Sequence, residues 1–242
     1  MQRYLPFSAF LNRYFDGKIQ KITIDAGFSC PNRDGFISNG GCIYCNNRSF
    51  SPGFTAEKRD IARQMEEGKR FFMRKYPEMK YLAYFQSFTN TYAPVSRLKQ
   101  LYEEALDVDD VVGLVIGTRP DCVSDELLHY LAELRRRHFV MMEYGVESTD
   151  DAVLRRINRG HDYACAVEAV RRTAAAGLPV GIHLILGLPG ESADHVCRVA
   201  REISALPVDI VKLHQLQIIK GTPLAREYQE NPACVRLFTV DE

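Results

Sequence analysis

The sequence predicts one α/β domain over residues 1–242, built as a partial (β/α)6 barrel with a short N-terminal helix. Segments with strand character alternate six times with segments of helical spacing, an order that requires parallel strands joined by right-handed crossovers. Residues 111–117 form a continuous apolar run, as expected for a parallel strand buried on both faces. No glycine-rich dinucleotide turn follows the first strand, which favours a partial barrel over an open doubly wound sheet.

Hydrophobic periodicity defines the individual elements. Apolar residues at helical spacing predict a helix over 7–15, and alternation of apolar with polar residues predicts the first strand over 19–28. Ser124 and Ser192 are expected helix N-caps, and Pro223 opens the last helix. The other expected strands are 80–86, 111–117, 139–146, 180–188 and 210–219; the other helices are 55–76, 96–106, one after Ser124, 150–157, 163–176, 192–205 and 223–230.

Composition limits the possible roles of the chain. Its 242 residues are 46% hydrophobic, enough for one globular core, and 31 basic residues balance 31 acidic ones. The formal net charge of zero gives no general reason to expect nucleic-acid or membrane binding. No apolar run is long enough to span a bilayer, and residues 1–14 lack the apolar core of a signal peptide. We therefore expect a cytoplasmic protein, whose domain can continue beyond Glu242.

A loop rich in glycine and polar residues follows the first expected strand and contains Cys30, Cys42 and Cys45. Cys42 and Cys45 form a CxxC pair, and the glycines before them let the chain fold back to bring Cys30 alongside. Three thiolates are an incomplete set for structural zinc, which prefers four protein ligands. They suit an iron–sulfur cluster in which one iron keeps an open position.

Other uses of these thiols stay open on this reasoning. Zinc could take a remote fourth ligand, a histidine or a later cysteine, and the chain would then be a zinc-binding interaction module. Cys42 and Cys45 could form a redox dithiol, although this leaves Cys30 without a role. A disulfide framework fits poorly with seven cysteines in a long chain. The four later cysteines have no ferredoxin-like spacing and predict no second cluster; they are Cys122, Cys165, Cys197 and Cys234.

Polar and glycine residues follow each of the expected strands. The carboxyl ends of parallel strands meet at one rim, where α/β proteins of this kind bind their ligands. We therefore expect the site at this rim. Besides the cysteine loop, its segments are 86–92, 118–121, 145–148, 187–191 and 220–223.

The cysteine loop resembles the cluster-binding motif of the radical S-adenosylmethionine (SAM) superfamily. The common pattern in that family is CxxxCxxC with an aromatic residue before the last cysteine, and Tyr44 holds that position here. The longer first interval is similar to that of relatives of the Elongator catalytic subunit. Residues 25–35 look most like a YhcC/YtqA-like bacterial group.

Three later segments extend the resemblance to about residues 3–230. Residues 145–148 and 157–161 are similar to the branch of oxygen-independent coproporphyrinogen oxidase. Residues 187–191 are similar to the segment after the fifth strand in many members. The resemblance implies a radical SAM-type barrel.

The resemblance also implies the cofactors. Cys30, Cys42 and Cys45 would hold a [4Fe–4S] cluster, and SAM would bind its open iron. A reducing partner such as flavodoxin or ferredoxin would supply one electron, which cleaves SAM to a 5′-deoxyadenosyl radical that abstracts hydrogen from a substrate. Position along the chain assigns further residues to SAM binding: Tyr44, Gln86, Ser87, Glu147, Arg159, His183, Gly187 and Gly190.

The assigned residues are expected to contact different parts of SAM. Tyr44 is expected beside the adenine, Glu147 at the ribose or amino-acid portion, and Arg159 at a carboxylate. Gln86 and Ser87 stand where many members carry Gly-Gly-Glu, so this chain lacks that glutamate. Alternation in the fifth strand could point His183 into the barrel, although a lone histidine there is more often a core residue. No residue is assigned to a catalytic role beyond cofactor binding.

The sequence leaves the substrate open between two classes. Likeness to the Elongator relatives suggests modification of the tRNA wobble uridine. Basic runs at 69–75, 135–137, 155–156 and 171–172 are candidate contacts, although such runs are usually solvated helix faces. A small-molecule substrate, as in porphyrin chemistry, is the rival. The sequence predicts nothing about the oligomeric state.

Overall fold

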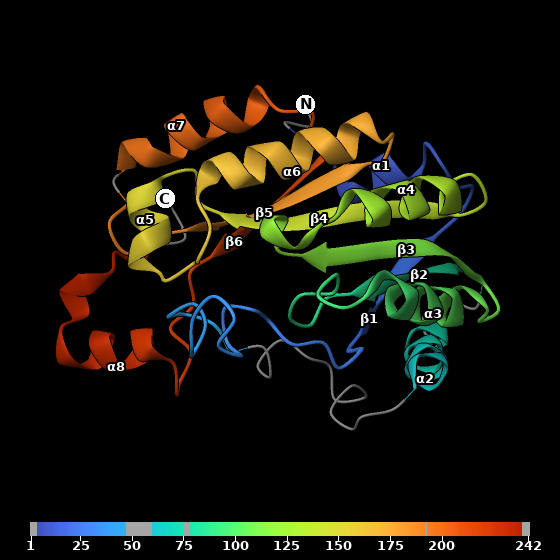
Figure 1. Ribbon diagram of the computed structural model, residues 1–242, viewed down its shortest axis with the longest axis horizontal. Helices are drawn as coiled ribbons and strands as arrows, with labels where there is room; N and C mark the ends of the chain where they lie inside the picture. Colours follow the sequence, from blue (N-terminus) through green and yellow to red (C-terminus); the bar gives the residue numbers. More distant parts are fainter. Residues whose placement is uncertain (1–3, 47–59, 75–77, 192, 239–242) are drawn as a thin grey trace.

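The computed structural model describes residues 4–46, 60–74, 78–191 and 193–238, and its centre is a parallel sheet of six strands. The strand order follows the chain, β1-β2-β3-β4-β5-β6, and every neighbouring pair is parallel. β1 and β6 are the two edges, so the sheet is an open half-barrel, which confirms the predicted fold class (Figure 1). The strands are β1 (Ile19–Ile24), β2 (Lys80–Phe85), β3 (Val111–Thr118), β4 (Phe139–Glu147), β5 (Val180–Leu186) and β6 (Ile210–Gln215).

Helices connect successive strands and cover the outer face of the sheet, as Figure 1 shows for α4, α6 and α7 above it. Two short helices, α1 and α8, lie outside this layer. None of the described helices is long and apolar enough to cross a membrane. The helices are α1 (Phe7–Leu11), α2 (Ile61–Met73), α3 (Val95–Leu106), α4 (Asp125–Leu134), α5 (Asp151–Arg156), α6 (Tyr163–Ala175), α7 (Ala193–Ser204) and α8 (Pro223–Glu230), with 3-10 turns η3 (Pro120–Cys122) and η4 (Pro232–Cys234).

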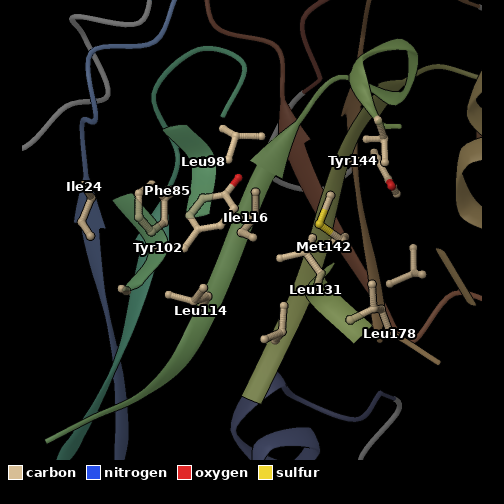
Figure 2. Close-up of a cluster of buried hydrophobic side chains, with 14 of the residues drawn as sticks. Ile24, Phe85, Leu98, Tyr102, Leu114, Ile116, Leu131, Met142, Tyr144 and Leu178 are labelled. Atoms are coloured by element: carbon tan, nitrogen blue, oxygen red, sulfur yellow. The ribbon is translucent and has the colours of Figure 1, made fainter. Parts of the chain in front are cut away.

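The main hydrophobic core lies between the sheet and these helices (Figure 2). Phe85 of β2 and Tyr102 of α3 pack edge to face, with ring centroids 5.0 Å apart. The Tyr102 hydroxyl donates a hydrogen bond of 2.6 Å to the backbone carbonyl of Asn90, so its only polar atom is satisfied within the core. This apolar layer leaves the opposite, concave face of the sheet free for polar groups.

The amino-terminal end of the concave face is closed by α1. Phe10 and Leu11 are buried there against Leu82, Val115 and Met141, which point inward from β2, β3 and β4. Figure 1 shows α1 and the cysteine loop at opposite ends of the sheet. This hydrophobic cluster therefore closes the amino-terminal end of the half-barrel and leaves the carboxyl ends of the strands open for the site.

Several predicted strands end earlier than expected, because the chain turns away to build the site. β1 stops at Ile24 instead of residue 28: the side chain of Gln64 bonds both the N–H and the C=O of Asp25, each at 2.9 Å, and replaces a strand partner. β5 and β6 likewise end at Leu186 and Gln215, before the predicted 188 and 219.

The helix predictions differ at fewer points. α1 ends at Leu11, not residue 15, and the chain continues in turns. α2 begins after its N-cap Asp60, whose side chain accepts from the backbone N–H of Arg63; the expected positions 55–59 and 75–76 lie outside the described residues. Ser124 is the N-cap of α4, as predicted. The predicted cap Ser192 also lies outside the described residues.

Candidate functional site

A cavity of about 250 Å³ opens at the carboxyl ends of the strands. The cysteine loop after β1 forms one wall, and residues of the five other strands or of the segments that follow them form the rest. The structure therefore brings together residues that are far apart in the sequence. Nine of the residues predicted for the site line this cavity: Cys30, Cys42, Tyr44, Cys45, Gln86, Ser87, Glu147, Arg159 and His183.

Gly187 and Gly190 do not line the cavity, in contrast to the other predicted residues. A side chain at Gly187 would come within 3.2 Å of the Arg236 carbonyl oxygen, so this glycine lets the C-terminal segment approach. The carboxylate of Glu191 accepts from the backbone N–H groups of Gly187 and Leu188, at 2.9 and 3.1 Å. This turn therefore supports the rim of the barrel and does not form a cavity wall.

Asn32 fixes the cysteine loop from inside. Its side chain is fully buried, and Nδ2 donates a hydrogen bond of 2.6 Å to the carbonyl oxygen of Asn158. The same amide lies 3.6 Å from Cys42 Sγ, and Oδ1 accepts from Ser38 Oγ at 3.0 Å. Asn32 thus joins the two halves of the loop to the segment between α5 and α6.

Asn158 holds the loop from the other side. Its Nδ2 donates to Ser38 Oγ at 3.1 Å and to the Gly41 carbonyl at 2.9 Å. Its backbone lies in the left-handed region, with φ of 54°, a conformation that asparagine tolerates better than most residues. Directly beside it, the N–H of Ile43 donates to the Ile157 carbonyl at 3.0 Å. The loop is therefore clamped by side-chain and backbone bonds.

Gly160 permits this close approach of two segments. Its φ is 81°, and a Cβ there would lie 2.7 Å from Asn32 Oδ1 and 3.3 Å from Arg119 Nη2. Arg119 is buried and donates to the Arg159 carbonyl at 2.9 Å. A bidentate pair with Asp121, at 2.9 and 2.7 Å, compensates its charge and holds the pKa of that carboxyl below its usual value despite burial.

Arg159 is the cation next to the cysteines. It is 7% exposed, and Nη1 lies 3.7 Å from Cys42 Sγ, while Nη2 donates to the Gly145 carbonyl and lies 3.8 Å from Glu147 Oε1. Burial alone would lower its pKa, but the acidic groups beside it, Cys42 first, then Tyr44 and Glu147, raise it above the usual value, so the guanidinium stays charged. Its Nε is buried and finds no hydrogen-bond partner among the residues that the structure describes.

The donor set around the thiols fits an iron–sulfur cluster. Cys42 Sγ faces two N–H donors, from Asn32 and Arg159, of the kind that hydrogen-bond a sulfur ligand of a metal centre. Burial and the neighbouring Cys42 raise the pKa of Cys45 to about 11, so metal binding must displace a proton there. Among the described residues, no three His, Cys, Asp or Glu side chains converge on the position of a single metal ion.

Glu143 is the buried acid on the concave wall of the cavity. Its carboxylate forms an ion pair with Lys21 and accepts from His183 Nε2 at 2.9 Å. Burial alone would raise its pKa, but the His183 hydrogen bond and the Lys21 charge lower it well below the usual value. Burial and the nearby Glu143 raise the pKa of Tyr84, which lines the same cavity. Glu143 is therefore an ionised acceptor for Lys21 and His183.

Sequence reasoning missed several residues that build the site. Asn158 and Gly160 lie inside a segment that the sequence singles out, but their tie to the cysteine loop depends on tertiary contacts. The signal for Glu143 is visible in retrospect, because it is the only charged residue between Phe139 and Gly145 in β4. A charge inside such an apolar run needs a buried partner, and the structure supplies Lys21 and His183.

The structure is a half-barrel with three thiols and a cofactor-sized cavity at the carboxyl ends of its strands. This arrangement is typical of a class of α/β enzymes that hold a metal cluster at the barrel rim. The family model of the Radical SAM superfamily matches residues 35–203, so this chain belongs to that superfamily. It is therefore a radical SAM enzyme, and the cofactors of its family are a [4Fe–4S] cluster and SAM.

Sequence relatives extend over most of the chain. YtqA of Bacillus subtilis is 38% identical over 229 residues, which are 95% of this chain and 71% of YtqA. YhcC of Escherichia coli is 40% identical over 224 residues, which are 92% of this chain and 71% of YhcC. A tRNA uridine(34) acetyltransferase of Methanocaldococcus infernus is 31% identical over 130 residues, which are 50% of this chain and 24% of that protein.

Solved structures show the same fold at low sequence identity. N-terminally truncated Elp3 of Methanocaldococcus infernus has a TM-score of 0.66 at 18% identity, over 91% of this chain and 50% of the Elp3 chain. Coproporphyrinogen III oxidase (HemN) of Escherichia coli has a TM-score of 0.58 at 17% identity, over 94% of this chain and 51% of the HemN chain. This chain thus spans about half the length of either structure.

We expect Asn158 to be needed for cluster retention. Asn158→Ala removes the bonds to Ser38 and Gly41 and leaves a strained left-handed residue, whereas Asn158→Gly removes the bonds alone. Each lost bond costs about 1 kcal/mol and the strain about 1–2 kcal/mol. Iron per chain after anaerobic reconstitution and desalting should fall in the order wild type, Asn158→Gly, Asn158→Ala. Asn12→Ala, at the exposed end of α1, is the control; equal iron in all four proteins would contradict the anchoring role.

The Glu143 network should make stability depend on pH. The folded pKa of Glu143 lies below its unfolded value, so its stabilisation is complete above the unfolded pKa and is lost as pH falls below about 5. Glu143→Gln leaves the partly buried Lys21 without its carboxylate partner and should cost about 3 kcal/mol at pH 7, the lower end for breaking a buried pair, with a smaller loss at pH 4. Urea unfolding at both pH values measures this. Glu133→Gln, which breaks an exposed pair with Arg136, should cost less than about 1 kcal/mol; equal costs would refute the assignment.

Proposed function

We propose that Cys30, Cys42 and Cys45 hold the [4Fe–4S] cluster and that SAM binds in the adjoining cavity. The supporting observation is the shared cavity wall: all three thiols line it, and Asn32 and Arg159 direct N–H groups at Cys42 Sγ. Reduced by a one-electron donor such as flavodoxin or ferredoxin, the bound cluster supplies reductive cleavage of SAM to a 5′-deoxyadenosyl radical.

The residues around the thiols suit the polar parts of SAM. The carboxylate of Glu147 can accept hydrogen bonds from ribose hydroxyls or from the methionyl amine, and Gln86 offers an amide on the facing wall. Nε of Arg159, which has no partner within the described part of the chain, suits a carboxylate oxygen. Burial and the charges of Cys42 and Glu147 raise the pKa of Tyr44, so its phenol stays protonated next to the site. Closing this cavity around the cofactor keeps water and other hydrogen donors away.

Tests of the cluster ligands separate this proposal from a zinc module. Cys30→Ala, Cys42→Ala and Cys45→Ala should each lose most of the roughly four irons per chain expected after anaerobic reconstitution, and with them SAM cleavage upon reduction. Cys122→Ala removes a half-buried thiol near the loop and is the matched control, which should keep its iron. Zinc in place of iron in the purified wild type, or a full cluster in all three loop variants, would refute the assignment.

We further propose that the substrate is tRNA, with a uridine as the modified base. The support is the likeness to a protein named tRNA uridine(34) acetyltransferase and the Elp3-like fold. The basic runs contribute little, because Arg136, Arg156 and Arg172 form ion pairs with Glu133, Glu227 and Asp125. The proposal therefore depends on the relatives and on the cavity, and not on a basic surface.

Nucleosides of cellular tRNA test this substrate. Cells that carry only the Cys45→Ala variant should lack a uridine-derived nucleoside found in cells with the wild-type or Cys122→Ala protein, as measured by mass spectrometry. Bulk tRNA should also bind the reconstituted enzyme, with affinity that falls steeply between about 50 and 200 mM salt. Identical nucleosides in all strains, with no salt-dependent binding, would contradict the tRNA proposal and favour a small-molecule substrate.

A further inference from the structure

His183 lies on the concave face of the sheet beside the buried acid Glu143. Both residues line the cavity, and the side chain of His183 is 17% exposed. Strand register pairs Glu143 of β4 with Gly181 of β5, where a Cβ would lie 2.9 Å from Glu143 Cγ. The missing side chain at Gly181 therefore lets the carboxylate lie against β5 and meet the imidazole two positions further along the strand.

The bond to Glu143 decides which nitrogen of His183 carries the proton. His183 Nε2 lies 2.9 Å from Glu143 Oε2, and Lys21 pairs with the other carboxylate oxygen. Burial would raise the pKa of this carboxyl, but the His183 bond and the Lys21 charge hold it well below its usual value, so the carboxylate can only accept. Nε2 is therefore the donor, and a neutral imidazole in this tautomer presents the lone pair of Nδ1 as an acceptor.

The acceptor Nδ1 of His183 opens into the cavity. Among the residues that the structure describes, it has no hydrogen-bond partner, and it is not one of the buried polar atoms that lack one. A fixed acceptor on a cavity wall binds a ligand group that donates a hydrogen bond. Because an anionic oxygen has no proton to donate, this position disfavours carboxylates and phosphates and favours a neutral N–H or O–H group.

His214 of β6 lies next to this acceptor. It lines the same cavity, and its ring centroid is 5.2 Å from that of His183. Burial, with His183 and Lys212 nearby, lowers the pKa of His214 to about 4, so its ring is neutral at physiological pH. In the described part of the chain neither of its ring nitrogens has a hydrogen-bond partner. The two rings therefore present a neutral acceptor and a neutral N–H donor side by side.

We propose that His183 and His214 recognise the base edge of the substrate uridine, with His183 Nδ1 accepting from the imide N3–H and His214 donating to an adjacent carbonyl. This inference rests on the proposed function, which makes a tRNA uridine the substrate. Uracil carries its N3–H between two carbonyl oxygens, so its edge complements an acceptor beside a donor. Cytosine has an unprotonated N3 at this place, and its lone pair would face the lone pair of His183 Nδ1. The two histidines therefore select uridine over cytidine.

The other side of the cavity is left for the cofactors. The three thiols lie on the loop after β1, and the residues proposed for SAM, Gln86, Glu147 and Arg159, lie at the ends of β2 and β4 and after α5. The two histidines belong to β5 and β6, at the opposite side of the half-barrel from β1. His183, which its position along the chain assigned to SAM, is thus assigned to the substrate.

The test uses the reconstituted enzyme with SAM, without reductant, and an RNA stem–loop with the sequence of a tRNA anticodon arm. The loop carries uridine, 3-methyluridine or cytidine at the position of uridine 34, so the phosphates are identical and only the base edge changes. The wild type should bind the uridine form about ten-fold more tightly than either of the others, because both leave His183 Nδ1 without a donor. Fluorescence anisotropy measures the three affinities.

Variants assign this selectivity to the imidazole. His183→Leu removes the acceptor, so the preference for uridine over cytidine should disappear. Glu143→Gln supplies an amide that can donate to Nε2, so Nδ1 can carry the proton and the preference should fall as well. His138→Leu changes a half-buried histidine that does not line the cavity, and this matched control should keep the wild-type preference.

The outcomes separate this inference from the proposed function. Equal binding of the three RNAs by the wild type, a comparison that needs no variant to fold, would overturn the inference, as would a preference that persists in His183→Leu. Absence of binding by all three RNAs would overturn it together with the tRNA part of the proposed function. SAM cleavage by the wild type upon reduction is measured in parallel, and its failure counts against the proposed cluster and SAM site alone.

Discussion

The cysteine loop must keep its shape with little regular secondary structure of its own. Within residues 30–45 the described backbone forms turns and one isolated bridge, between Asp34 and Asn39. Its conformation is therefore imposed by bonds to the segment after α5, more than a hundred positions later in the chain. The side chain of Asn32 donates to the Asn158 carbonyl, and the side chain of Asn158 donates to the Gly41 carbonyl in the loop. A backbone bond from the N–H of Ile43 to the Ile157 carbonyl completes the contact. The conformation of the cysteine loop thus depends on the connection between α5 and α6, which contains no cysteine.

The two faces of the sheet are stabilised by different interactions, apolar packing on the outer face and ionic hydrogen bonds on the inner face. The outer face packs against helices through apolar contacts such as Phe85 against Tyr102, and this burial stabilises the sheet. The inner face places Glu143 and its partners in a poorly solvated space, where ionic groups gain stability only when each bond is made. Stability from the outer layer lets the inner face carry charges that a core would not tolerate, and the cavity is built from this face.

The fold could be predicted from sequence because its signals are local. Alternation of strands with amphipathic helices fixes the parallel order. Ser124 as N-cap and Pro223 as the first helical residue mark helix starts that the structure confirms. Strand ends at the rim were overestimated because residues such as Asp25 look strand-like but bond a side chain, Gln64, that only tertiary structure brings near. Local pattern contains no information about such a partner.

The location of the site could be predicted from the sequence, but the residues that face the cavity could be predicted only in part. The cysteine spacing and the polar segments after each strand located the cavity, because parallel topology brings all strand ends to one rim. Gly187 and Gly190 were assigned to the cavity on the same reasoning, but the turn between them folds onto Glu191 and the C-terminal segment. Position at a strand end selects the rim, whereas the direction of each backbone turn decides which residues face inward.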